Sequence, residues 1–277
     1  MIIADFIGKK TIGDVGIEIE VEGEMLPPSV GLWRREVDGS LRGNESAEYV
    51  LNKPVSIDLV RRELDILKKA FVDYNSVFNE SPRAGVHVHI NVCDLTFKQV
   101  ITMICIYIIL EEFFIRYCDK SRDGNLFCLP SYNAGYLLSQ IRRSCETEDA
   151  YVLRTDEIRY SSVNINSLFK YGSVEFRSLE STYNFDKILH WCKMLHKIKL
   201  AALKYDNPAE LLLSFSKNEC VPMINTIMEE YAAKFLEHKD ALKVTREGIL
   251  RAQDIAFSRD WTSKNLNIFL KKAGVFN

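Results

Sequence analysis

The chain has 277 residues, of which 47% are hydrophobic and 27% are charged, and its formal net charge is −2. This length and apolar fraction are enough for a sizeable core in one large domain or two tightly joined ones. Arg and Lys are spread along the chain, which argues against a nucleic-acid-binding or membrane-surface protein, so any anion they bind is expected to be small.

The cysteines and the N-terminus argue against further classes of protein. The seven Cys are odd in number and form no CxxC pair, so we expect reduced thiols in the cytoplasm rather than a disulfide framework or a cysteine zinc site. Met1–Lys10 lacks the basic-then-apolar layout of a secretory signal. The most apolar run, Val100–Leu110, is too short to span a bilayer, which predicts a core helix and no membrane segment.

The N-terminal part of the chain has mainly strand patterns. Alternation of apolar and polar residues, or turn residues between short apolar runs, predicts strands at Gly16–Glu22, Trp33–Val37, Glu48–Leu51 and Gly85–Val92. Asp38–Ser40 has the composition of a turn between the second and third strands. Between the third and fourth strands, Pro54–Phe78 has the periodicity of a helix.

The remaining chain is mainly helical in pattern. Helices are predicted at Thr96–Cys118, Ala134–Cys145, Phe185–Tyr205, Ala209–Ser216, Val221–Leu236, Asp240–Ala256 and Thr262–Ala273. Residues 119–132 are expected to form a loop, and Lys170–Gly172 to form a turn between strands Arg159–Asn166 and Ser173–Leu179. Because strands and helices do not alternate regularly, we expect an α+β fold, with a catalytic domain at 1–205 and a helical extension at 206–277 packed on it.

Three acids share one face of the first strand. Glu18, Glu20 and Glu22 are spaced two residues apart, which places neighbouring carboxylates roughly 7 Å from each other. Burying this face without cations would be costly because of repulsion and desolvation. The face is therefore either solvated or binds metal, and its hard oxygen atoms suit Mg²⁺.

Two other strands carry polar pairs on one face. His87 and His89 form one pair, which can be a metal-binding pair or a structural one. Glu175 and Arg177 form the other pair, which can be a plain salt bridge or a metal ligand beside a guanidinium that grips a phosphoryl oxygen. The other histidines lie on predicted helices and are expected at the surface or in packing: His190, His196 and His238.

Single polar residues at strand ends are ambiguous by themselves. Asp38 begins the predicted turn and Glu48 begins the next strand. Arg159 and Asn164 belong to the strand before Glu175, where Asn164 shares a face with Ser162 and Asn166. Turn chemistry, surface exposure or a buried amide would explain each of them. Taken together, strands that gather acids, imidazoles and guanidinium groups on one face make a poor core face and indicate a metal–nucleotide site.

This ordered set resembles the amidoligase family, a branch of the carboxylate–amine ligases that include glutamine synthetase and glutamate–cysteine ligase. The motifs that carry the resemblance are GIEIEVEG, DGSL followed by Glu48, AGVHVHI, and RYSSVN followed by GSVEFRSLEST, over roughly residues 12–195. The resemblance implies a curved, mainly antiparallel catalytic sheet like that of glutamine synthetase, with helices packed on its outer face.

The resemblance also implies a role for each matching residue. The implied metal ligands are Glu18, Glu20, Glu48, His87 and Glu175. The residues implied to contact nucleotide, phosphate or substrate are His89, Arg177, Arg159 and Asn164, with Asp38 acting toward metal or the amine. Glu22 is expected to be a solvated neighbour, and further phosphate-binding arginines are sought among Arg142, Arg143 and Arg154.

The activity implied by the resemblance is ATP-dependent amide or isopeptide bond formation. Two Mg²⁺ ions, or Mn²⁺, would serve as cofactors, and a small-molecule or peptide carboxylate would be activated as an acyl phosphate before an amine attacks it. A separate glutamine amidotransferase could supply ammonia. Two alternatives stay open: a metal-dependent hydrolase on the same site, and a non-catalytic module that binds nucleotide or peptide. The oligomeric state is also open.

Overall fold

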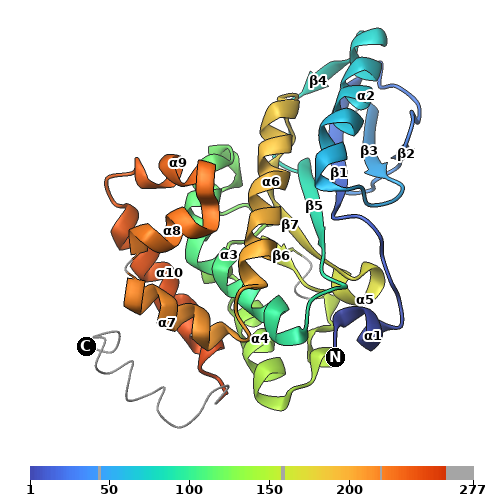
Figure 1. Cartoon of the computed structure of the whole chain (residues 1–277). Coiled ribbons are helices and arrows are strands. Elements are labelled where there is room, and N and C mark those ends of the chain that lie inside the picture. Colours follow the sequence, from blue (N-terminus) through green and yellow to red (C-terminus); the bar gives the residue numbers. More distant parts are fainter. Residues whose placement is uncertain (43–44, 157–159, 219, 260–277) are drawn as a thin grey trace.

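A seven-stranded sheet forms one layer of the computed structural model, which describes residues 1–42, 45–156, 160–218 and 220–259 (Figure 1). Its order is β2-β3-β1-β5-β7-β6, with β4 paired to β1, and every strand pairing is antiparallel. The strands are β1 (Val15–Glu24), β2 (Trp33–Glu36), β3 (Glu45–Leu51), β4 (Val77–Asn79), β5 (Gly85–Asn91), β6 (Val163–Asn164) and β7 (Ser173–Glu180). This confirms the predicted α+β class and its mainly antiparallel sheet.

The two faces of the sheet differ because the strand sequences alternate. On β1, Ile17, Ile19 and Val21 are almost completely buried and belong to the hydrophobic core. The intervening acids point to the opposite face, as successive side chains of a strand must. The same alternation places Val86, Val88 and Ile90 of β5 in the core, so the histidines between them share the face of the acids.

Helices cover the apolar face of the sheet. The central one is α3, whose side chains are buried over most of its circumference and whose start is fixed by a capping box between Thr96 and Gln99. Figure 1 shows α7 to α10 grouped at the end of the molecule opposite β2 and β3. The helices are α1 (Ile3–Ile7), α2 (Val60–Asp73), α3 (Phe97–Tyr117), α4 (Gly135–Thr147), α5 (Ser167–Tyr171), α6 (Phe185–Ala202), α7 (Pro208–Asn218), α8 (Cys220–Met228), α9 (Ala232–Leu236) and α10 (Ala241–Ala256).

Two predicted helices are interrupted in the structure. The helix expected over Pro54–Phe78 is wrong at its end, because Asn75 adopts a left-handed conformation with φ 52° and the chain then forms β4 against β1. The helix expected over Val221–Leu236 is likewise broken by the positive φ of Glu229, 48°, which separates α8 from α9. A non-glycine residue with positive φ cannot continue a right-handed helix, and periodicity alone does not reveal it.

The segment before β7 also differs from the prediction. Within the described part of Arg159–Asn166, only Val163 and Asn164 pair as a strand. The expected turn at Lys170–Gly172 is instead the end of α5, which Gly172 terminates with a φ of 70°. Residues 119–132 contain two short 3-10 helices, and the helix expected at Thr262–Ala273 lies outside the described residues.

The structure also bears on disulfide bonds and on membrane-spanning helices. No disulfide bond joins cysteines in the part of the chain that the structure describes. Within the ranges that the structure describes, no helix combines the length and apolarity required to cross a bilayer.

Candidate metal centre

The strand register gathers polar residues from five strands on one face of the sheet. Glu20 is paired with Glu48 of β3, and Glu18 is paired with His87 of β5. His89 and Asn164 are both paired with Glu175, from β5 and β6 respectively. Because directly paired residues point to the same face, these side chains must meet. They line a cavity of about 850 Å³ together with Asp38, Arg177, Lys9, Arg154, Asp156, Asn166, Lys170 and Tyr171.

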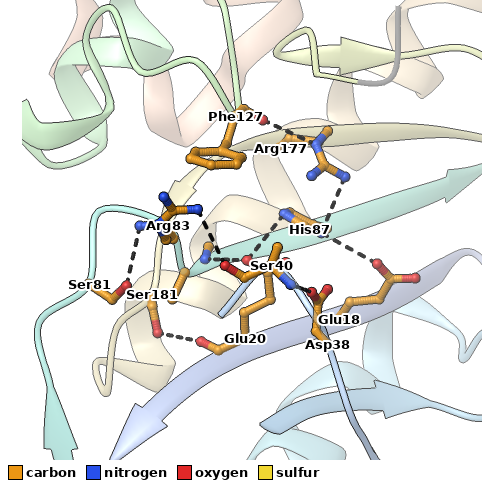
Figure 2. A network of polar contacts seen from close by, with 12 residues as sticks. Glu18, Glu20, Asp38, Ser40, Ser81, Arg83, His87, Phe127, Arg177 and Ser181 are labelled. Atoms are coloured by element: carbon orange, nitrogen blue, oxygen red, sulfur yellow. Dashed lines mark hydrogen bonds and ion pairs between the residues drawn. The ribbon is translucent and has the colours of Figure 1, made fainter. Parts of the chain in front are cut away.

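The imidazole of His87 lies among three carboxylates, and Figure 2 shows two of them, those of Glu18 and Glu20. Its Nδ1 is 3.4 Å from Oε2 of Glu18 and 3.8 Å from Oε1 of Glu175. Its Nε2 is 3.7 Å from Oε2 of Glu20, which also accepts a hydrogen bond from the backbone N–H of Gly85 at 2.7 Å. Both ring nitrogens therefore lie within reach of carboxylates that come from different strands.

His89 has a buried nitrogen in the same cluster. Its Nδ1 lies 3.1 Å from the hydroxyl oxygen of Ser173, while its Nε2 lies 3.2 Å from Oε1 of Glu18. The contact with Glu18 has the distance of an ion pair but not the geometry of a hydrogen bond, so Nε2 has no hydrogen-bond partner in the described residues. A buried nitrogen aimed at carboxylates and lacking a hydrogen bond is suited to bind a cation.

Glu48 and Glu18 of the cluster have pKa values shifted in opposite directions. Burial, followed by repulsion from Glu18, Glu20 and Asp38, raises the pKa of Glu48 to about 8. Burial also opposes ionisation of Glu18, but the neighbouring His89 and His87 hold the pKa of this carboxyl well below its usual range. Carboxylates packed this closely repel one another, and a bound cation relieves that repulsion.

Among the described residues, the donor atoms form three groups that could each surround an ion. Within each group the ligand atoms lie within 4.8 Å of one another, and the groups are Glu18–His89–Glu175, Glu18–Glu48–His87 and Glu20–Asp38–Glu48. The first and third groups share no residue, so both could be occupied at the same time. Carboxylate oxygens with one imidazole nitrogen suit Mg²⁺ or Mn²⁺.

Arg177 borders the cluster on β7. Its Nη1 forms an ion pair with Glu175, and its Nε donates to the backbone oxygen of Phe127 at 3.4 Å. Burial opposes the charge of this guanidinium, but Glu175 raises its pKa, so it stays cationic. The other oxygen of Glu175 accepts a hydrogen bond from Nδ2 of Asn164 at 2.7 Å. Asn164 therefore orients Glu175 and does not merely satisfy backbone groups.

Additional cations line the cavity. Lys9, Lys170 and Arg154 contribute positive charge to its wall, and Nζ of Lys9 donates to the backbone oxygen of Lys170 at 3.2 Å. Of the three arginines proposed to bind phosphate, only Arg154 lines the cavity; Arg142 forms a surface pair with Glu146. Arg159 lies outside the described residues. The two lysines were missed because no motif or spacing connects them to the strands.

Two polar residues lie in other surroundings than expected. Glu22 is not a solvated neighbour: it is buried and accepts a hydrogen bond from the backbone N–H of Arg42 at 2.9 Å. Ser162 does not share the face of Asn164, because its hydroxyl donates to the buried Glu111 of α3 at 2.5 Å. The short, irregular β6 breaks the alternation on which that expectation depended.

Most of the chain matches the model of a known protein family. Residues 29–199 match a protein family described as "Putative amidoligase enzyme", and this span is more than half of the chain. It contains Glu48, both strand histidines, Glu175 and Arg177, whereas Glu18 and Glu20 precede it. No curated protein matches the sequence.

Proposed function

The chain belongs to the amidoligase family, and we propose that it is an ATP- and Mg²⁺-dependent ligase that joins a carboxylate to an amine. The observation that carries the proposal is the presence of two non-overlapping groups of cation ligands beside the guanidinium of Arg177. Family membership supports a ligase. The cavity combines these candidate metal ligands with the cationic side chains of Lys9, Arg154, Lys170 and Arg177. This combination supports a nucleoside triphosphate as co-substrate, because metal ions and cationic side chains together bind phosphates.

The carboxylates and imidazoles of the cluster would hold two divalent cations. Glu18, His89 and Glu175 would bind one of them, and Glu20, Asp38 and Glu48 the other. Mg²⁺ bound there would neutralise negative charge on the phosphate oxygens. The acid of Glu48 would then be ionised, since a neighbouring divalent cation favours the charged form of a carboxyl.

The cationic side chains would bind and orient the phosphates. Arg177 holds a planar guanidinium beside Glu175, with Nη2 free of any hydrogen bond recorded for the described residues. Such a group can stabilise the negative charge on a phosphoryl group in transfer. Lys9, Arg154 and Lys170 would offset the charge of the remaining phosphates along the cavity wall.

The reaction would proceed in two transfers. The substrate carboxylate oxygen attacks the γ-phosphorus of ATP, the bond to the β-γ bridging oxygen breaks, and an acyl phosphate and ADP form. The amine nitrogen then attacks the carbonyl carbon, inorganic phosphate leaves, and the nitrogen loses a proton to give the amide. The acids of the cavity would attract a cationic amine and assist this loss of a proton.

An assay of ADP release tests the proposal. Purified protein with Mg²⁺ and ATP is incubated with a panel of carboxylate and amine pairs, and ADP and the amide product are measured. We expect ADP and amide in equal amounts for at least one pair, and release that depends on both substrates. Hydrolysis of an amide without ATP, with zinc copurifying, would instead identify a metal-dependent hydrolase. Tight ATP binding without ADP release from any pair would identify a binding module.

A further inference from the structure

The strand that carries Arg177 is irregular at that residue. The pairing of β5 with β7 shifts between Val86 and Val88: Val86 is paired with Leu179, but Val88 is paired with Phe176. Two residues of β7, Arg177 and Ser178, therefore oppose His87 alone. Such a bulge leaves backbone groups without ladder partners and re-aims the side chains beside it.

Arg122 satisfies the carbonyl groups at this bulge. Its Nη2 donates to the backbone oxygen of Arg177 at 2.8 Å, and its Nε donates to that of Ser178 at 3.2 Å. Its Nη1 donates to the backbone oxygens of Pro82 and Ala84, both at 3.4 Å, at the start of β5. One guanidinium thus joins the two strands at the point where their ladder is disrupted.

Arg122 is buried and has no acidic partner. It is 2% exposed, it does not line the cavity, and it forms no ion pair with any carboxylate of the described residues. A buried charge that is offset only by carbonyl dipoles is costly, because the charged group loses its hydration. A buried arginine at this position therefore calls for a specific structural or functional role. Because it lies outside the cavity, that role cannot be contact with a bound phosphate.

Glycine at position 85 makes room for this guanidinium beside the metal centre. A Cβ at Gly85 would lie 2.9 Å from Nη2 of Arg122 and 3.4 Å from Nε2 of His87. The guanidinium therefore packs on the same face of β5 as His87. The backbone N–H of Gly85 donates to Glu20, so this short segment links Arg122 to the cation ligands.

We propose that Arg122 is a positioning residue, which holds the bulge of β7 against β5 and so fixes the direction of Arg177 relative to His87. The backbone N–H of Arg177 donates to the oxygen of Ser162 at 2.9 Å, so Arg122 and Ser162 together hold both backbone groups of Arg177. A guanidinium can do this because it offers five N–H donors in a fixed plane, whereas an ammonium group cannot reach four carbonyls.

Hydrogen exchange tests whether Arg122 holds the bulge of β7 against β5, and it does so independently of any activity. Arg122→Met and Arg122→Lys are compared with wild type, and Arg142→Met, which removes a surface arginine, is the matched control. We expect both Arg122 variants to lose protection in the peptide spanning 173–180 while α3 stays protected, and the control to match wild type. Full protection of 173–180 in a folded Arg122→Lys variant would overturn the inference, whether or not Arg122→Met folds.

The second measurement, which rests on the proposed function, is steady-state ATP turnover by the same proteins. Loss of an outer partner of a site residue commonly costs about 10–100-fold in activity, so we expect a fall of that size in kcat, with a small change in KM for ATP. Arg122→Lys should not restore kcat, because it cannot bridge the carbonyls. An unchanged kcat per folded molecule would refute the positioning role. If wild type releases no ADP, the proposed function fails, and the exchange result alone decides this inference.

Discussion

Glu18 and His87 are directly opposed on β1 and β5, with Oε2 of the acid 3.4 Å from Nδ1 of the imidazole. The other oxygen of the same carboxylate lies 3.2 Å from Nε2 of His89. Glu18 therefore contacts both histidines and belongs to two of the three groups of cation ligands. This single acid is the point at which the strands β1 and β5 would share a metal ion.

Glu18→Gln should remove most of the stabilisation that Mg²⁺ gives the protein. A ligand present at 100 times its Kd stabilises the native state by about 2.7 kcal/mol, and a lost carboxylate ligand weakens that binding. Thermal unfolding with and without Mg²⁺ measures the effect. Glu22→Gln is the matched control, since Glu22 lies on the same face of β1 but in none of the three groups. Equal Mg²⁺ responses of the two variants would contradict the assignment of Glu18.

Arg177→Ala should abolish ATP turnover and leave the fold largely intact. The guanidinium pairs with Glu175, one of the proposed metal ligands, so its loss would remove charge stabilisation from the proposed phosphoryl transfer. A loss of roughly 10³-fold is the scale seen when such a charge-stabilising group is removed. ADP release and circular dichroism are measured together, with His190→Ala as control because His190 lies on α6, outside the cavity. Normal ADP release from Arg177→Ala would count against the proposed function.

Asn164→Ala should weaken metal binding through Glu175. The amide of Asn164 donates to Oε2 of Glu175 at 2.7 Å, and without it the carboxylate loses its orienting hydrogen bond. Loss of such a partner typically lowers metal affinity by about 10-fold or more. Titration with Mn²⁺ followed by electron paramagnetic resonance measures the affinity directly. Asn166→Ala is the control, because Asn166 lines the same cavity but its amide binds Asp156 instead; identical affinities in both variants would refute this role.

Glu111→Gln should flatten the pH dependence of stability. Burial raises the pKa of Glu111 above 4.5, although Ser131, Ser162 and Arg251 of α10 act in the opposite direction. Because its pKa is higher in the folded than in the unfolded state, Glu111 stabilises the folded protein while it is protonated. This contribution to the free energy of unfolding is complete below about pH 4.5 and is lost as the pH rises through the folded-state pKa. The stability of wild type relative to the variant should therefore fall with rising pH, by at most about 1.4 kcal/mol per pH unit.

Urea unfolding of wild type and Glu111→Gln across pH 4 to 8 checks this dependence. The carboxamide oxygen of the variant can still accept the backbone N–H of Ser131, so the loop contact is kept. Parallel pH profiles for the two proteins would show that Glu111 does not titrate differently in the folded state.

Gly248→Ala should destabilise the packing of α10 on α3. A Cβ at this position would overlap the backbone oxygen of Ile109, so one helix must move away from the other. Overpacking of this kind costs about 1–3 kcal/mol, which urea unfolding can measure. Gly135→Ala is the control, because a Cβ there meets nothing within 4 Å. Equal stability of the two variants would mean that the helices do not approach this closely.

Much of the fold follows from local pattern. Alternation on β1 and β5 assigned both strands and their polar faces, because side chains of a strand point to opposite sides whatever the rest of the chain does. The wrong predictions concern helix ends, where the backbone conformation of a single residue overrides the hydrophobic periodicity. Asn75 and Glu229 adopt positive φ values and break helices that periodicity predicted to continue.

The site could be predicted only in part. Glu18, Glu20, His87 and Glu175 were found because each lies on an alternating strand, and the structure brings them together in one cavity. Lys9, Lys170 and Arg122 were not found, since they come from a terminal segment and two short helices whose positions depend on packing.

The sequence by itself determined which side chains share a face of each strand, since that depends only on the two-residue period of the backbone. Tertiary structure alone decided which strands are neighbours, and hence that Glu18 meets His87 and that Glu175 meets His89. It also decided the bulge at Arg177 and the burial of Arg122 against it. These features depend on contacts between segments far apart in the chain, and no local pattern encodes the register in which such segments pair.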